Sequence, residues 1–417
     1  MINYDVVVIG GGPAGLAAAI SAKKCGSNVL LIERESRLGG ILKQCIHDGF
    51  GLVKFGEKLS GTEYAERYID EFHELKIDYD VLTFVTSIKH KDVGFVVTIV
   101  NKEGVTDIFS RTIILATGCR ERTAKQVSIH GTRPAGVFTA GSAQHFVNLL
   151  GQMPTRRCVI LGSGDIGLIM ARRLTLEGAK VVGVYEAKST PSGLTRNIHQ
   201  CLHDYDIPLY LSHTVTRVFG NDRLEAVEIS EVDDKMQPIP NTSEIVECDS
   251  LILSVGLIPE NELAEKLGVE IDNNAKGAKC DAQFMTSEKG IFTCGNATHV
   301  NDLVDYVSES GEIAGRAASC FDKHLGRKLV NITTNDKVLY IVPEMLDLNQ
   351  KNNNAILYFR SKLVLDKCKI RVIIDNKNVF EKKYAFLRPP EMERIAFDFD
   401  KFNLTEKSEI KFEIVEG

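Results

Sequence analysis

DVVVIGGGPAG, residues 5–15, is an apolar run that ends in a glycine-rich turn, and this stretch decides the fold. An Ala-rich helical stretch follows, and the next apolar run ends at Glu33. This order of strand, glycine turn, helix, strand and acid is typical of a βαβ unit that binds a dinucleotide. In such a unit Gly10 makes the tight turn, Gly12 lets the backbone approach a pyrophosphate, and Gly15 lets the helix pack on the strand. The helix N-terminus offers its N–H groups to the phosphates.

The same pattern occurs again about 150 residues later, where CVILGSGDIG leads into a helical stretch and a strand that ends at Glu186. Glu33 follows Gly10 by 23 residues and Glu186 follows Gly162 by 24, close to the spacing expected of a carboxylate that holds a ribose hydroxyl. Two copies predict two dinucleotides with electrons passing between them; the alternative is one site and one degenerate copy. The residues expected at the second cofactor are Gly162, Gly164, Asp165, Ile166, Gly167, Glu186 and Gly256.

Composition indicates an ordinary α/β protein. The 417 residues are 44% hydrophobic and 25% charged, and the net charge of −6 argues against a nucleic-acid surface. The ten cysteines show neither a CxxC pair nor metal-ligand spacing, which predicts reduced thiols, no metal and a cytoplasmic location. The apolar N-terminus lacks the basic region of a signal peptide, and no stretch is long enough for a transmembrane helix.

In the rest of the chain, apolar runs that end in glycine occur several more times, and a region without glycine turns follows them. Apolar runs end at Gly118 and Gly256, and a late strand ends at Gly295 before a helix-like stretch, residues 302–325. After Arg327 the glycine turns disappear, and polar turns separate strand-like segments that predict a small all-β sandwich or barrel. These segments are residues 338–342, 355–359, 370–374, 395–399 and 410–414.

Over roughly residues 1–328 these motifs resemble flavoproteins with two dinucleotide-binding domains, the glutathione-reductase and thioredoxin-reductase superfamily. The resemblance implies an α/β fold of two Rossmann-like domains, one inserted in the other, with a C-terminal all-β domain added here. It implies FAD at the first motif and NAD(P)H at the second. The expected domains are residues 1–122 and 287–328 for FAD, 123–286 for NAD and 329–417 for the β domain.

The resemblance also implies which residues hold FAD. Asn296 stands where the family usually has aspartate, so it keeps a hydrogen-bonding side chain and loses the charge. The helix entered near residue 302 is expected to direct its N-terminal amides at the flavin. The residues implied at FAD are Gly10, Gly12, Pro13, Ala14, Gly15, Glu33, Arg34, Gly40, Ala116, Thr117, Gly118, Gly295, Asn296 and Val304.

Sulfur separates this chain from disulfide reductases. Residues 136–144, where thioredoxin-reductase-like members carry a CxxC shortly before the second motif, hold no cysteine, and the Gly39-Gly40 pair is followed by the single thiol Cys45. Disulfide exchange needs an attacking and a resolving thiol, so this activity is not expected. The stretches GCRER, RPAGVFTAGSAQ and CIHDGFG resemble instead the FAD subunits of dye-linked amino-acid and opine dehydrogenases, and flavoproteins encoded with anaerobic-type glycerol-3-phosphate dehydrogenases.

Two residues have a candidate catalytic role and a structural alternative, and a third indicates which nicotinamide cofactor is bound. Cys45 and His47 are candidate catalytic groups beside the flavin; the alternatives are a small buried hydrophobe and a structural histidine. Glu186 favours NAD over NADP, because a carboxylate accepts from a free 2′-hydroxyl and repels a 2′-phosphate.

The sequence therefore predicts an oxidoreductase that uses FAD and NAD and moves a hydride between nicotinamide and flavin. Its electrons would pass to or from a second redox subunit or a small-molecule substrate, in a hetero-complex or a homodimer. The alternatives are a stand-alone NADH oxidase or peroxidase that uses Cys45, and a non-catalytic scaffold that binds nucleotide.

Overall fold

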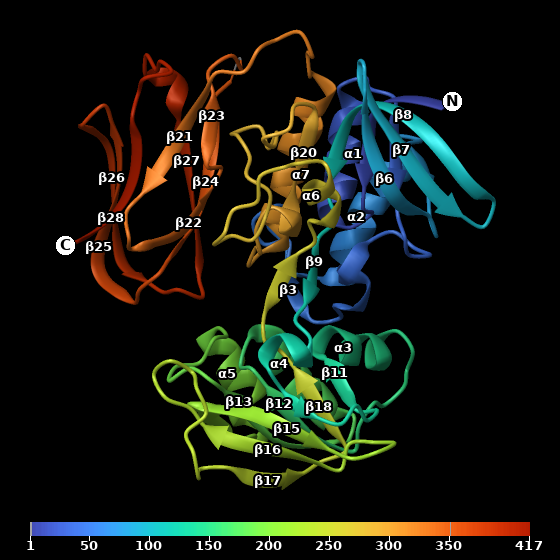
Figure 1. The fold of residues 1–417 in the computed structure, drawn as a ribbon, viewed down its shortest axis with the longest axis vertical. Coiled ribbons are helices and arrows are strands. Elements are labelled where there is room, and N and C mark those ends of the chain that lie inside the picture. Colours follow the sequence, from blue (N-terminus) through green and yellow to red (C-terminus); the bar gives the residue numbers. More distant parts are fainter. Residues whose placement is uncertain (1, 351) are drawn as a thin grey trace. The chain divides into compact units, whose positions relative to one another are not determined.

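The computed structural model describes residues 2–350 and 352–417, and the chain divides into two compact units. The first unit combines the two ends of the chain, up to Cys119 and from Pro259 onward. The second unit is Arg120–Ile258, drawn mainly in green in Figure 1. The predicted fold class is confirmed: two α/β units, one inserted in the other, with a strand-rich C-terminal region.

A mostly parallel sheet forms the centre of the first unit, in the order β5-β2-β1-β8-β7-β6, with β20 also paired to β8. The parallel pairs are β1 with β2 and β8, β2 with β5, and β8 with β20. Its parallel strands are β1 (Ile2–Ile9), β2 (Val29–Ile32), β5 (Asp78–Asp80), β8 (Gly104–Leu115) and β20 (Ile291–Thr293).

An antiparallel extension, β6 (Phe84–Lys91) and β7 (Gly94–Asn101), continues the sheet from β8. Residues 105–109 and 112–115 are strand-like segments that the polar residues Ser110 and Arg111 separate in the sequence. In the structure both belong to the single strand β8, whose first half pairs with β7 and whose second half pairs with β1 and β20. One long strand thus serves both halves of the sheet.

Helices α1 (Pro13–Lys24) and α7 (Val304–Ser319) pack closely over one face of this sheet. Gly311 lies against the backbone of Ala14, and Gly315 lies against the backbone of Ala18, so any larger side chain at either glycine would collide with α1. Small residues on both helices therefore join the first motif to the late helix-like stretch. Helix α2 (Gly61–Glu74) adds Tyr64 and Phe72 to the same core.

Residues 259–286, which the sequence assigned to the second domain, fall in the first unit. Helix α6 (Glu262–Lys266) and the turn after it place Ala264 and Leu267 in one buried cluster with Val7 and Ile113 of the first sheet. These apolar contacts are the reason the segment belongs with the first sheet.

The second unit holds a five-stranded parallel sheet in the order β11-β18-β12-β13-β14 and an adjacent sheet, β10-β15-β16-β17. The parallel strands are β11 (Val137–Thr139), β12 (Arg157–Leu161), β13 (Lys180–Glu186), β14 (Leu209–Leu211) and β18 (Ser250–Leu253). Its helices are α3 (Ala140–Asn148), α4 (Asp165–Leu176) and α5 (Thr195–Cys201). The adjacent sheet is β10 (His130–Gly131), β15 (His213–Phe219), β16 (Ala226–Glu231) and β17 (Glu244–Glu247).

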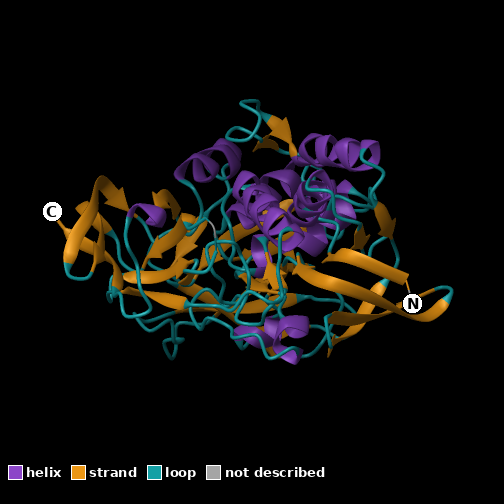
Figure 2. Ribbon diagram, turned by 90° about the horizontal axis from the view of Figure 1, so that it is seen from above, coloured by secondary structure: helices purple, strands orange, loops and turns teal. Residues whose placement is uncertain are grey.

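The C-terminal region is a sandwich of two sheets, β23-β21-β28-β25-β26 and β22-β24-β27, and Figure 2 shows it almost wholly as strands and loops. All five predicted segments overlap strands. The sequence missed three strands, β21, β23 and β26, and in β26 most residues are polar or exposed. The strands are β21 (Leu329–Thr334), β22 (Val338–Val342), β23 (Met345–Asp347), β24 (Asn354–Ser361), β25 (Leu365–Ile374), β26 (Lys377–Leu387), β27 (Met392–Asp398) and β28 (Ile410–Glu416).

Short strand pairs complete the fold: β3 (Asp48–Phe50) with β4 (Leu59–Ser60), and β9 (Cys119–Glu121) with β19 (Leu257–Pro259). In the part of the chain that the structure describes, no helix combines the length and apolar character needed to cross a membrane.

Candidate cofactor sites

The predicted FAD residues gather at one edge of the first sheet. Gly10, Glu33 and Ala116 directly follow β1, β2 and β8, and Gly295 lies two residues after the end of β20. Because these strands are parallel, their carboxyl ends meet at the same edge, which is where open α/β sheets bind ligands. Segments that are almost 300 residues apart in the sequence thus converge on one place.

Both glycine turns can be built only with glycine. Gly10 has φ +111° and Gly162 has φ +97°, a region that disfavours residues with a side chain. A Cβ atom at Gly10 would also strike the carbonyl oxygen of Ala116, and one at Gly162 would strike that of Ser254. The two turns therefore have the same backbone geometry and the same neighbour, the end of the adjacent strand.

Each turn opens directly into the first turn of a helix. Helix α1 begins after Gly12 with Pro13 in its first turn, and α4 begins after Gly164. Neither N-cap residue has a side chain that accepts a hydrogen bond from the helix. A helix N-terminus with a positive end is what a pyrophosphate requires, so both turns fit a dinucleotide.

The first acid is held in place by the turn itself. The Oε2 atom of Glu33 accepts the N–H of Gly11 at 2.6 Å, and its Oε1 accepts the N–H of Glu35 at 2.8 Å. The Glu33 side chain is buried within the unit. A carboxylate has about four acceptor sites, so two remain for hydroxyl groups of a ribose.

The second acid repeats this arrangement. The Oε2 atom of Glu186 accepts the N–H of Ser163 at 3.0 Å and its hydroxyl at 2.6 Å, and Oε1 accepts the N–H of Lys188 at 3.1 Å. In both units the carboxylate therefore binds the residue between the first two glycines and the residue two positions after itself. This shared geometry argues against a degenerate second copy.

The second turn has polar contacts that sequence reasoning missed. Asp165, at the start of α4, accepts the N–H of Leu194 at 2.9 Å and the side-chain amide of Asn197 at 2.7 Å. The hydroxyl of Ser163 accepts the N–H of Ser192 at 2.9 Å. Residues 192–197 are thereby fastened beside the glycine turn. The only sequence signal was the presence of two polar residues, Ser163 and Asp165, inside the motif.

The late strand leads to a hydrogen-bonded loop. The N–H of Gly295 donates to Ser310 Oγ at 2.8 Å. Asn296 Oδ1 accepts the N–H of Asn301 at 3.0 Å, and its Nδ2 contacts Cys119 Sγ at 3.5 Å. The amide at position 296 is thus used both as acceptor and as donor, which gives a physical reason for asparagine in place of aspartate.

The remaining predicted residues lie around these groups. The backbone of Gly40 passes close to that of Gly12, Thr117 Oγ1 donates to the carbonyl of Glu260 at 2.6 Å, and Gly167 donates to Ser254 Oγ at 3.0 Å. Gly15 packs on Gly10, and Ala14 is buried against α7. Ile166 lies on α4, and Val304 is the first residue of α7. Gly118 and Gly256 have positive φ angles, and Arg34 is exposed.

The structure gives Cys45 the character of a packing residue. The thiol is 5% exposed, Sγ lies 3.4 Å from the carbonyl oxygen of Ile41, and burial raises the pKa of Cys45 to about 12. A thiol that resists ionisation is a poor nucleophile. His47 is half-buried, with its ring 5.1 Å from that of Phe50. No disulfide joins any of the ten cysteines, all of which lie among the described residues.

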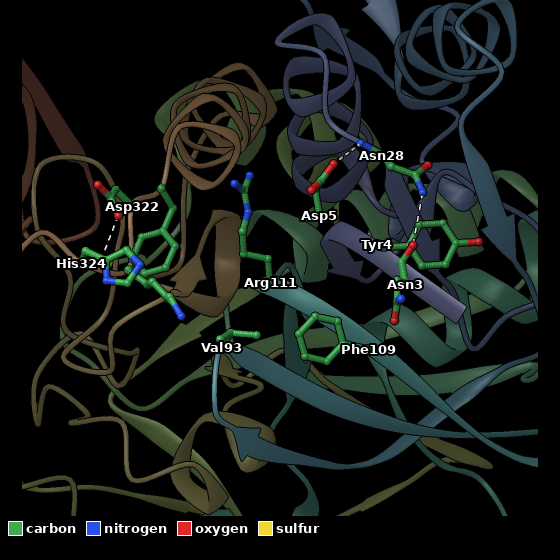
Figure 3. Close-up of a pocket in the computed structure, with 11 residues that line it drawn as sticks. Asn3, Tyr4, Asp5, Asn28, Val93, Phe109, Arg111, Asp322 and His324 are labelled. Atoms are coloured by element: carbon green, nitrogen blue, oxygen red, sulfur yellow. Dashed lines mark hydrogen bonds between the residues drawn. The ribbon is translucent and has the colours of Figure 1, made fainter. Parts of the chain in front are cut away.

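A cavity of about 600 Å³ in the first unit lies elsewhere (Figure 3). It is lined by Asn3, Tyr4 and Asp5 at the beginning of β1 and by Arg111 in the middle of β8. This is the amino-terminal end of β1, whereas the glycine turn follows its carboxyl-terminal end, so the cavity is separate from the cofactor residues.

Comparison with known proteins agrees with this geometry. The chain belongs to the pyridine nucleotide-disulphide oxidoreductase family, which matches residues 4–318. The hydrogen cyanide synthase subunit HcnB of Pseudomonas protegens is 27% identical over 76% of this chain and 70% of its own length. An opine oxidase subunit of Agrobacterium tumefaciens is 23% identical over 76% of this chain and 64% of its own. T. acidophilum thioredoxin reductase has the same fold, with a TM-score of 0.62, 19% identity, and coverage of 76% of this chain and 98% of that one.

The chain is therefore an oxidoreductase with FAD and a nicotinamide dinucleotide as its cofactors. The family match ends at residue 318, so the C-terminal β domain lies outside it.

Proposed function

We propose that this protein transfers a hydride between NAD(H) and bound FAD and exchanges electrons with a second redox subunit. The complex would be a dehydrogenase of the glycerol-3-phosphate, opine or amino-acid type. The observation that carries the proposal is the repeated cradle: two glycine turns whose acids, Glu33 and Glu186, make equivalent hydrogen bonds in two separate units. Two complete cradles supply two dinucleotides, as hydride transfer between cofactors requires.

The residues of the chain would bind and orient, while bound FAD supplies the ring that accepts or gives the hydride. In the first unit the N-terminus of α1 would hold the FAD pyrophosphate and Glu33 its adenosine ribose. Gly295 and Asn296 would lie along the ribityl chain, and the N-terminus of α7 would face the ring. In the second unit α4 and Glu186 would hold the nicotinamide dinucleotide in the same manner.

NAD is the expected nicotinamide cofactor, because of the charge at position 186. Glu186 is buried, and its two oxygens already accept backbone N–H groups, so the carboxylate is fixed in place. A 2′-phosphate at that position would meet a fixed negative charge, whereas a 2′-hydroxyl would donate to it. Arg172 and Arg173 do not compensate, because both lie within α4 and not after β13, and Arg173 is paired with Glu177 at 2.7 Å.

A separate electron partner is supported by what the chain lacks and by its relatives. Cys45 has no second thiol joined to it in a disulfide, and its raised pKa disfavours a thiolate, so the chain offers no internal sulfur relay. The hydrogen cyanide synthase and opine oxidase relatives are each described as one subunit of a larger enzyme. The same thiol character weighs against a stand-alone peroxidase that depends on Cys45.

The deciding experiment is anaerobic titration of the purified, FAD-loaded protein with NADH and, separately, with NADPH. We expect about one equivalent of NADH to bleach the flavin absorbance and NADPH to act far more slowly. Reduction by neither nucleotide would contradict the hydride-transfer proposal and favour a nucleotide-binding scaffold. Purification from the native cell as a single, fully active chain would contradict the partner subunit.

A further inference from the structure

The C-terminal β domain is attached to the loop that connects the predicted flavin residues to α7. This loop, residues 295–303, runs from Gly295 to Leu303, the N-cap of α7. The buried cluster of the first sheet and its helices continues without a break into Tyr340, Tyr358 and Met392 of the sheet β22-β24-β27. The β domain therefore packs directly beside the loop.

Arg360, on β24, makes the central polar contact. Its side chain is only 12% exposed. Nη2 donates to the carbonyl oxygen of Val300 at 3.2 Å and pairs with Asp302, and both acceptors belong to the loop. Nε donates to Tyr340 Oη at 2.8 Å, and Nη1 donates to the carbonyl of Pro390. One planar guanidinium thus joins two strands of the β domain to two positions of the loop.

The β domain makes further contacts with the loop. Asp302 lies one residue before the N-cap of α7, and its Oδ2 accepts the N–H of Met392 at 2.6 Å. The His299 ring is 1% exposed and lies 5.7 Å from the Tyr340 ring and 5.3 Å from the Tyr358 ring. The segment between β20 and α7 is therefore enclosed by aromatic and charged groups of the β domain.

This attachment reaches the predicted flavin residue in one further step. Asn301 lies between the two positions that Arg360 holds, and its N–H donates to Asn296 Oδ1 at 3.0 Å. Its side-chain amide donates to the carbonyl of His299 at 3.0 Å. Displacement of residues 300–302 would therefore change both the orientation of the Asn296 side chain and the direction in which α7 begins.

A second ion pair offers an internal comparison. Arg394, on β27, binds Glu309 of α7 through Nε at 2.9 Å and Nη2 at 2.5 Å, and Tyr358 Oη donates to the same carboxylate at 2.6 Å. This pair also joins the β domain to the first unit's helices, but it contacts α7 beyond its first turn and does not touch the loop.

We propose that Arg360 is a positioning residue for the flavin: through Val300 and Asp302 it sets the orientation of Asn296 and of the α7 N-terminus. The inference rests on the proposed function, which places FAD at Gly295 and Asn296. A helix N-terminus stabilises negative charge near it. Loss of Arg360 is therefore expected to weaken FAD binding and to move the flavin reduction potential to more negative values.

The test compares Arg360→Gln with Arg394→Gln and with Arg371→Gln in the full-length protein. Arg371 belongs to the same domain and pairs with Glu381 on the surface, so its variant is the matched control. FAD affinity is measured by flavin fluorescence, the potential by equilibration with a reference dye under chemical reduction, and folding of the FAD-free protein by thermal melting.

We expect Arg360→Gln to weaken FAD binding about fivefold or more. We also expect the flavin reduction potential to become more negative by up to about 30 mV, which is a tenfold change in the equilibrium constant of a two-electron couple. Arg394→Gln is expected to lower the melting temperature with the potential unchanged. Arg360→Lys keeps the positive charge and loses the planar guanidinium with its several donors, so its FAD affinity and potential should lie between those of the unaltered protein and Arg360→Gln.

The proposal is overturned if Arg360→Gln matches Arg371→Gln in FAD affinity and potential, or if Arg394→Gln shifts the potential equally. If Arg360→Gln does not fold, Arg360→Lys and Tyr340→Phe decide by the same two measurements. Because the flavin is reduced chemically, these results do not depend on NADH. Failure of NADH to reduce the unaltered protein would contradict the proposed function alone.

Discussion

Glu186 is the residue whose substitution reports most directly on the nicotinamide cofactor. Its carboxylate is fixed by Ser163 and Lys188, and a hydrogen bond to a charged group contributes about 1.5–3 kcal/mol. We expect Glu186→Ala to raise the KM for NADH roughly tenfold or more and to reduce the preference over NADPH, with little change in kcat. Steady-state reduction of a dye by both nucleotides measures this.

Glu177→Ala is the matched control, because Glu177 lies on the outside of the same unit and pairs with Arg173. Its kinetic constants should equal those of the unaltered protein. An NADH preference that survives in Glu186→Ala would show that another group selects the cofactor.

Because His299 is buried, we expect it to make the free energy of unfolding depend on pH. Burial first, and the nearby Arg360 charge second, lower the pKa of His299 to about 3. As pH falls below about 6.5 the unfolded chain takes up a proton and the folded protein does not, so this contribution to stability decreases by at most about 1.4 kcal/mol per pH unit. Between pH 6.5 and 5 the advantage over His299→Gln should shrink by about 2 kcal/mol.

Urea denaturation of the unaltered protein and His299→Gln at pH 7 and pH 5 checks this difference, and comparison with the variant removes the contribution of other acids and bases. His324→Gln, on the surface, serves as the control. An equal gap between the two proteins at both pH values would mean that His299 takes up its proton as readily in the folded protein as in the unfolded chain.

At the scale of elements, the contact between α1 and α7 is decided by two glycines. A methyl group at position 311 would collide with the backbone of Ala14, which cannot move without displacing the start of α1. We expect Gly311→Ala to cost about 1–3 kcal/mol, the usual range for overpacking, and to weaken FAD binding. Thermal melting with and without FAD measures both effects.

Gly326→Ala is the control for that substitution, because a Cβ atom at position 326 meets only the far end of the Asn349 side chain at 3.8 Å. Similar melting temperatures for the two variants would contradict a tight approach of the helices.

The elements that sequence reasoning predicted are those with short-range signals. Gly10 and Gly162 could be recognised because a turn, a helix and an acid follow each within about 25 residues. The strand β26 could not, because residues such as Lys377 and Lys382 carry no apolar alternation and the strand is an exposed edge of its sheet.

The candidate site shows the same division. The glycines and acids of both motifs could be proposed from the sequence, whereas the contacts of Ser254, those of Asp165 with the segment 192–197, and those of Arg360 could not. Each of these acts through a contact with residues 29 to 87 positions away that no local pattern encodes. Short-range sequence motifs therefore predict the two dinucleotide-binding units. The long-range contacts between segments can be identified only in the folded structure.

At the scale of the whole molecule, Arg327 joins the end of the α/β part to the β domain. Its Nη2 lies 2.7 Å from Asp281 and its Nε 3.2 Å from Asp347, and both carboxylates are almost fully buried. Removing the Arg327 guanidinium leaves two buried carboxylates without their cationic partner, which lowers the free energy of unfolding by about 3–5 kcal/mol. We expect Arg327→Ala to lower the melting temperature strongly and to separate the unfolding of the two parts.

Calorimetry checks this prediction, with Arg371→Ala as the control. Arg371 and Glu381 form a partly exposed pair, and such pairs contribute about 1 kcal/mol or less. A single, unshifted transition in Arg327→Ala would show that apolar contacts alone hold the β domain in place.

The contact between Ala14 and Gly311 also has a consequence during synthesis. The two residues are 297 positions apart, so at about 5–20 residues per second α1 leaves the ribosome roughly 15–60 s before its partner helix exists. The second unit, complete at Ile258, can fold during that interval, while the Ala-rich face of α1 remains uncovered. The unit that begins first is thus the last to be finished, and a nascent chain stopped soon after residue 258 would have a second unit able to fold and an incomplete first unit.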